Sequence, residues 1–201
     1  MNKPALLLLP SLLIACGGRG VSSEREAELA YLGLDGALVK AMELGFDGYN
    51  AASSANIDPQ STDGDVSGTL TVTGQVDQGA SDNKGLRLEL SLVEYSDVVD
   101  LDQDDSDDDD LIVTYWTDAG EGLPAFNLQL KDIPDGTLSG TLVGSFDMRG
   151  DIEGPVSLNL TLDGLLEDDG QGGTQRVQGS TTVTGTATGP SNGVYEIDLQ
   201  L

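Results

Sequence analysis

The chain contains no histidine and only one cysteine, Cys16, among its 201 residues. Without histidine it lacks the commonest general base and every zinc site built on imidazole ligands. A single thiol allows neither an internal disulfide nor a pair of thiolate ligands. The sequence therefore excludes Ser-His and Cys-His catalysis, and we expect a protein that is not an enzyme.

Positive charge and aromatic side chains are also scarce. There are 9 Lys and Arg against 35 Asp and Glu, and aromatic residues make up 4% of the chain. A net charge of -26 repels nucleic acid and anionic lipid headgroups, so neither is an expected ligand. Pairs of carboxylates arise by chance in so acidic a chain, and one tryptophan makes a poor set of sugar platforms. A glycosidase is therefore disfavoured.

Continuous apolar sequence is limited to the first fifteen residues. Lys3 precedes a short apolar segment that contains Pro4 and Pro10 and ends in small residues. This is the layout of a secretory signal. A bilayer-spanning helix needs roughly twenty apolar residues, so the segment is too short to remain as an anchor.

The signal ends in Leu13-Ile14-Ala15-Cys16. This motif resembles the lipobox of bacterial lipoproteins. The resemblance covers residues 1–16 and implies cleavage before Cys16, diacylglyceryl attachment to its sulfur, and acylation of the new terminus. Gly17, where such lipoproteins carry Asp for inner-membrane retention, implies the outer membrane if the host is Gram-negative. The alternative is an ordinary secretory signal that is cut elsewhere.

Removal of residues 1–15 leaves 35 acidic and 8 basic residues, a formal charge of -27. The remaining chain divides into four parts, of which residues 66–201 are the last and longest. Residues 16–22 form a lipidated tether. Ser23 and Glu26 form a capping box, and apolar residues at helical spacing then predict an amphipathic helix over 23–45, with Gly45 as C-cap. Residues 46–65 have turn chemistry and are interpreted as a connector.

The predicted helix has two possible positions, on a membrane or on the core. Membrane-surface helices usually carry a basic face, and this one is acidic, so packing on the core is favoured. Gly33 and Gly36 weaken the helix, which indicates that it depends on such packing.

Residues 66–201 alternate apolar and polar side chains with period two. We predict a mainly β domain, an antiparallel meander of about eight strands that forms a curved open sheet or barrel with the helix packed on it. Glycines on the apolar face suit a sheet that curls around something. The eight runs are 66–76, 86–92, 111–116, 126–130, 138–148, 156–162, 177–187 and 195–201.

An acidic loop over residues 100–110 is the one candidate metal site. Asp100, Asp102 and Asp104 match the start of an EF-hand calcium loop, but Asp105 stands at its glycine position and Leu111 at its bidentate Glu position. The loop is interpreted either as a solvated acidic segment or as a weak Ca²⁺ site. Tyr115 and Trp116 follow it, as a binding rim or as strand residues that pack on a neighbour.

We therefore expect a membrane-anchored envelope lipoprotein with a binding or interaction domain and no certain cofactor. One alternative is a carrier, in which an apolar ligand fills a pocket of several hundred Å³ within the sheet, lined by Leu88, Leu90, Phe126, Leu142 and Leu160. That alternative fails if the helix fills the concavity. A second alternative is a calcium-dependent surface interaction protein. Oligomeric state is left open by the sequence.

Overall fold

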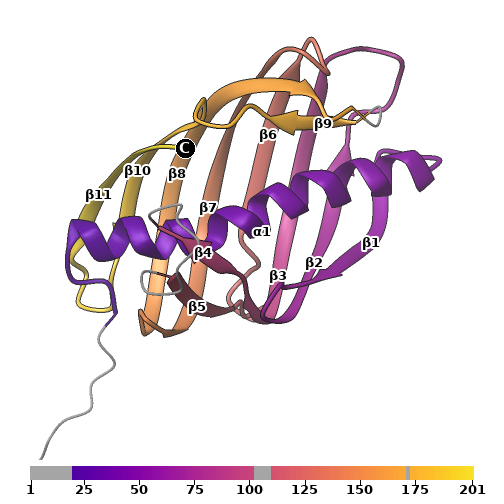
Figure 1. Cartoon of the computed structure of the whole chain (residues 1–201). Helices are drawn as coiled ribbons and strands as arrows, with labels where there is room; N and C mark the ends of the chain where they lie inside the picture. The colour runs from indigo at the N-terminus through magenta and orange to yellow at the C-terminus, as the bar shows by residue number, and fades with distance from the viewer. Residues whose placement is uncertain (1–19, 102–109, 171–172) are drawn as a thin grey trace, which may run out of the picture.

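A computed structural model of the chain describes residues 20–101, 110–170 and 173–201. One long helix, α1 (Glu24–Ala51), crosses an antiparallel sheet of eleven strands (Figure 1). The strands are β1 (Asn56–Asp63), β2 (Ser67–Val76), β3 (Lys84–Ser96), β4 (Val98–Asp100), β5 (Asp110–Trp116), β6 (Ala125–Lys131), β7 (Thr137–Gly150), β8 (Gly154–Asp168), β9 (Thr174–Arg176), β10 (Thr182–Thr188) and β11 (Val194–Gln200).

The sheet follows the order β1-β2-β3, then β5 and β6 together, then β7-β8-β10-β11. β5 and β6 both lie between β3 and β7: Phe126 of β6 is in register with Leu88 and Leu142, while Tyr115 of β5 is in register with Tyr95 and Met148. In the described residues this order ends at β1 and β11, which do not pair with each other, so the sheet is open. Figure 1 shows that it is also curved. The predicted fold class is confirmed.

The eight predicted runs correspond to β2, β3, β5, β6, β7, β8, β10 and β11. The seventh starts later than expected, at Thr182 rather than residue 177. β4 and β9 have three residues each, too few to show a period.

Two predicted boundaries around the connector were wrong. α1 continues to Ala51, and its Gly45 is an interior residue that packs against Leu86 and Leu88. The predicted connector contains β1, an edge strand in which Ile57 is the one buried residue. An edge strand with one buried side chain has almost no hydrophobic period, which explains why turn chemistry dominated the prediction.

α1 begins as its capping box predicts. The Ser23 hydroxyl accepts a hydrogen bond from the Glu26 backbone N–H at 3.2 Å. The Glu26 carboxylate accepts from the backbone and hydroxyl of Ser22, at 2.7 and 2.6 Å. The first contact satisfies a backbone donor of the first helical turn, and the other two hold the residue before the N-cap.

The core lies between α1 and the concave face of the sheet, as Figure 1 shows. The helix contributes mostly alanine and glycine to it; its large buried side chains are Tyr31, Leu34, Leu38 and Met42. The sheet contributes long aliphatic side chains, and its fourteen core leucines are at most 4% exposed. They are Leu70, Leu86, Leu88, Leu90, Leu92, Leu111, Leu128, Leu130, Leu138, Leu142, Leu158, Leu160, Leu162 and Leu166.

Two glycines of α1 allow the sheet to come close. A Cβ at Gly33 would collide with the Tyr115 hydroxyl, which donates to the carbonyl oxygen of Ala30 at 2.9 Å. A Cβ at Gly36 would lie 2.8 Å from Oδ2 of Asp97. The glycines with low helix propensity are therefore the positions where the helix meets the rest of the domain most closely, and the predicted packing of the helix on the core is confirmed.

We predict that Gly33→Ala destabilises the protein, although alanine has the higher helix propensity by about 1 kcal/mol. The new methyl group displaces Tyr115, and such overpacking costs about 1–3 kcal/mol. Urea unfolding followed by circular dichroism measures the change. Asn50→Ala, at an exposed position of the same helix, is the matched control and should change stability by less than about 0.5 kcal/mol. A Gly33→Ala variant as stable as the parent chain would contradict the steric explanation.

Candidate functional site

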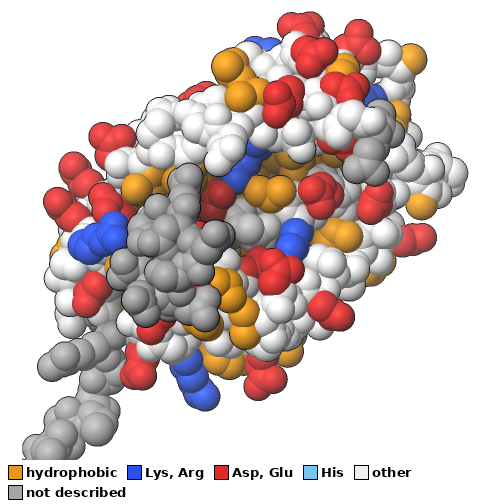
Figure 2. Space-filling model, in the orientation of Figure 1, with side chains coloured by type: hydrophobic (Ala, Val, Ile, Leu, Met, Phe, Trp, Pro, Cys, Tyr) orange, Lys and Arg blue, Asp and Glu red, His pale blue; other side chains and the backbone are white. Residues whose placement is uncertain are grey.

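The outer face of α1 forms the floor of a groove. Its volume is about 740 Å³, with walls formed by Val98–Leu101 on one side and Leu199–Leu201 on the other. A second hollow of about 540 Å³ continues it past Arg176 and Thr181, and shares Asp35, Val39 and Glu43 with it. Figure 2 shows this face, with acidic, basic and hydrophobic side chains gathered around the hollow.

Apolar side chains line both walls and the floor. Leu32 and Val39 of α1 are only partly covered. Val98 is 44% exposed, and Leu101, Leu199 and Leu201 are half-buried. The groove is thus an open, partly apolar surface of the size that small molecules or peptide segments occupy.

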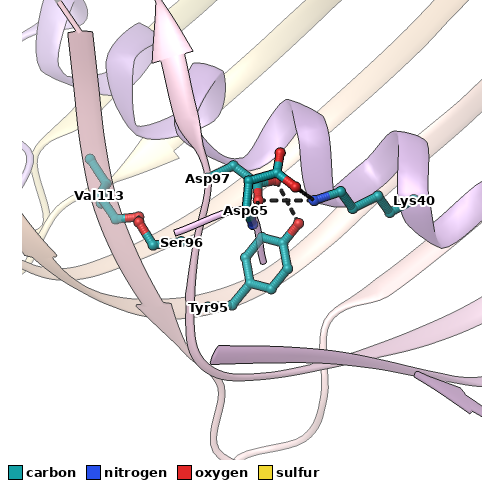
Figure 3. Close-up of polar contacts among 6 residues, drawn as sticks. All are labelled: Lys40, Asp65, Tyr95, Ser96, Asp97 and Val113. Carbon is teal, nitrogen blue, oxygen red and sulfur yellow. Dashed lines mark hydrogen bonds and ion pairs between the residues drawn. The ribbon is translucent and has the colours of Figure 1, made fainter. Parts of the chain in front are cut away.

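Asp97 is a polar residue of the groove lining whose side chain is only 5% exposed. Figure 3 shows three donors converging on it from different elements. Its carboxylate accepts from Lys40 Nζ at 3.0 Å, from the backbone N–H of Asp65 at 2.7 Å, and from the Tyr95 hydroxyl at 2.5 Å. Lys40 also contacts Asp65 at 2.9 Å. Asp97 therefore fastens α1 to β3 and to the turn before β2.

The neighbouring residue, Ser96, is completely buried and joins two strands. Its hydroxyl donates to the carbonyl oxygen of Val113 at 3.0 Å, as Figure 3 also shows. This contact links the end of β3 to β5, and so holds the strand end that carries Asp97. The position of the carboxylate is thereby fixed from both sides.

Two further contacts hold the helix on either side of Lys40. Asp35 accepts hydrogen bonds from Tyr31 and from both terminal nitrogens of Arg176, which reaches it from β9. Toward the end of the helix, Lys84 lies 4.6 Å from the ring centroid of Tyr49. Together with Asp97, these contacts fix α1 near its start, its middle and its end.

Burial and hydrogen bonding shift the pKa values of these groups. Burial alone would lower the pKa of Lys40, but hydrogen bonds to Asp65 and Asp97 outweigh it, and the pKa is raised. Arg176 follows the same pattern, with Asp35 as its partner, and its pKa is raised. Both cations thus stay charged within the groove, and each is neutralised by a carboxylate.

Three tyrosines carry the largest shifts. Burial raises the pKa of Tyr31, Tyr95 and Tyr115 well above 10, with further contributions from Asp35 at Tyr31 and from Asp97 at Tyr95. Phenols so placed remain neutral as long as the fold persists.

The sequence-predicted site residues lie mostly outside the described part of the chain. Cys16, Asp102 and Asp104 are not among the described residues. Asp100 ends β4 and lies in register with Asp110 of β5. Among residues 20–101, 110–170 and 173–201, no three His, Cys, Asp or Glu residues are grouped closely enough to hold a metal ion. The calcium site stays a prediction.

The five residues predicted to line a carrier pocket lie beneath α1. They are at most 3% exposed, because the helix packs over them. A gap of about 10 Å³ lies between helix and sheet beside Phe126 and Met42, with room for about one water molecule. The helix therefore covers the part of the concave face that these five residues form.

The predicted binding rim also changes. Tyr115 is completely buried and serves the helix contact described above. Trp116 is partly covered by Arg149, which lies 5.1 Å from its ring centroid. Sequence reasoning missed the groove, because its charged pairs join residues far apart in the chain: 57 positions separate Lys40 from Asp97, and 141 separate Asp35 from Arg176.

No helix in the described part of the chain is long and apolar enough to cross a membrane.

We predict that Asp97→Ala destabilises the fold by about 2–4 kcal/mol, because three donors lose their shared acceptor and Lys40 loses a buried partner. Urea unfolding provides the measurement. Asp77→Ala removes an ion pair with Arg87 whose side chains are about half exposed, and should change stability by less than about 1 kcal/mol. Equal effects of the two substitutions would show that Asp97 has no special structural role.

Alkaline unfolding should coincide with ionisation of the buried tyrosines. A phenol whose pKa is raised in the folded state contributes stability below its unfolded pKa, near 10, and loses that contribution as pH rises further. Absorbance at 295 nm and near-ultraviolet circular dichroism, recorded together, should therefore show three of the five tyrosines ionising only as tertiary structure is lost. Normal titration of all five in the folded protein would contradict the burial.

Comparisons of the chain with protein-family models, with curated proteins and with solved structures found no match. No relative therefore assigns a role to the groove or to Cys16. What these two features do is inferred from their own chemistry.

Proposed function

We propose that the chain is an envelope lipoprotein, cut before Cys16 and acylated there, whose folded part is a non-enzymatic binding domain. The lipobox at residues 13–16 supports the anchor, since a stable membrane anchor takes more than one acyl chain and a lipobox cysteine receives them. The proposed location is the outer membrane in a Gram-negative host.

The groove on α1 is the observation that carries the binding role. It combines partly exposed aliphatic walls with five carboxylates and two cations, and both cations are paired with carboxylates. Exposed apolar surface rimmed by charge is typical of interaction sites. Asp97 and Asp35 are held in structural hydrogen bonds, so they support a fixed surface rather than a reacting group.

The proposed anchor would hold the domain close to the membrane. Gly20 is already buried, against Pro190 and the carbonyl of Pro155. Gly20 follows Cys16 by four positions, a span of at most about 14 Å. The turn between β10 and β11 and the start of β8 would then be the end of the domain nearest the bilayer.

Intact mass spectrometry of the mature protein from membranes tests the anchor. We expect a chain that starts at Cys16 and carries acyl chains, and that partitions into the detergent phase of Triton X-114. Cys16→Ala should move the protein to the aqueous phase, while its circular dichroism spectrum stays unchanged. Gly18→Ala, two residues away, should keep the acyl mass. A free thiol at Cys16, or a terminus elsewhere, would reject the lipoprotein proposal.

A further inference from the structure

The two edges of the sheet differ in how well they are protected. β1 carries Pro59, which lacks a backbone N–H, and its pairing with β2 shifts register between Ile57 and Gln60. Proline and such irregularities are features that block the addition of another strand. β11 has neither, and its seven residues pair with β10 in uninterrupted register.

The hydrogen-bond pattern shows which backbone groups of β11 face outward. Thr181 and Leu201 exchange both backbone hydrogen bonds, each at 2.8 Å. In an antiparallel ladder this pattern repeats every second residue, so Leu199 and Ile197 also bond to β10. The N–H and C=O groups of the intervening residues, Glu196 and Asp198, therefore point to the open edge.

The groove opens beside this edge. Leu199, Gln200 and Leu201 all line it, although their side chains alternate between the two faces of the strand. On the face toward α1, Ile197 is buried and Tyr195 and Leu199 are half-buried, whereas on the other face Glu196 and Asp198 are exposed. A strand placed here would meet apolar surface on one side and carboxylates on the other.

Resting on the proposed binding role of the groove, we propose that β11 accepts a strand from a partner protein, in which aliphatic residues alternate with lysine or arginine. The aliphatic side chains would enter the groove above Leu32 and Val39. The basic side chains would lie beside Glu196 and Asp198, where opposite charges on neighbouring strands attract. Backbone hydrogen bonds to the edge would supply affinity, as in other cases of strand addition.

A second copy of the chain does not fit this edge. Pairing of two antiparallel β11 strands would bring Glu196 and Asp198 of one copy beside the same residues of the other, and like charges across strands are destabilising. The net charge of -26 opposes self-association further. Charge complementarity thus selects a basic partner.

Hydrogen exchange of the purified full-length chain in mild detergent tests the proposal. The probe is an acetylated heptapeptide of alternating valine and lysine. Amide exchange, measured residue by residue by NMR, should slow at least tenfold at Glu196 and Asp198 when the peptide is added, and should not change along β1. A peptide with the same residues in two blocks, and an alternating valine–glutamate peptide, should have no effect.

Two variants separate edge pairing from general charge attraction. Asp198→Pro removes an outward N–H without breaking the ladder to β10, so the fold should persist while peptide affinity falls at least tenfold. The double change Glu196→Lys with Asp198→Lys should also abolish binding, whereas Asp63→Lys at the opposite edge should not. Unchanged affinity in Asp198→Pro, equal binding of the block peptide, or absence of binding would each overturn strand addition. None of these results bears on the proposed acylation of Cys16. If the peptide bound in the groove but did not slow exchange along β11, the proposed binding role would stand and only strand addition would be rejected.

Discussion

The packing of α1 against the sheet requires hydrogen-bond partners for one buried carboxylate, that of Asp97. Asp97 lies at the interface between helix and sheet, where an ionised group without partners would destabilise the fold by several kcal/mol. Its three donors belong to α1, to β3 and to the turn before β2. The positions of these three segments are therefore coupled, and the groove that they border has a fixed shape.

The same interface explains the composition of the helix. A helix inside a curved sheet must be thin, and α1 turns alanines and glycines toward the strands while the strands supply leucines. Each interior glycine costs about 1 kcal/mol of helix propensity. Close packing against groups such as the Tyr115 hydroxyl offsets that loss.

Periodicity was sufficient to predict the helix, the eight main strands and the packing of one on the other, because each of these buries a regular stripe of side chains. It failed at β1, where a single buried residue, Ile57, leaves no stripe. It placed the helix end at Gly45, although Phe46 and Tyr49 continue the helical spacing after Met42. The groove was not predictable, since contacts such as Arg176 with Asp35 depend on how the sheet curls and not on local sequence.

The acidity of the chain has a further consequence once the sheet edges are known. An unprotected edge strand normally invites pairing with any exposed strand, including another copy of itself. Here Glu196 and Asp198 line the outer face of β11, so pairing with an acidic or identical strand is repelled while a basic strand is attracted. β1 is protected by backbone features such as Pro59 and β11 by charge alone. A basic partner strand is attracted by the same carboxylates that repel an acidic one. β11 is therefore an edge that can accept one class of strand and still reject others.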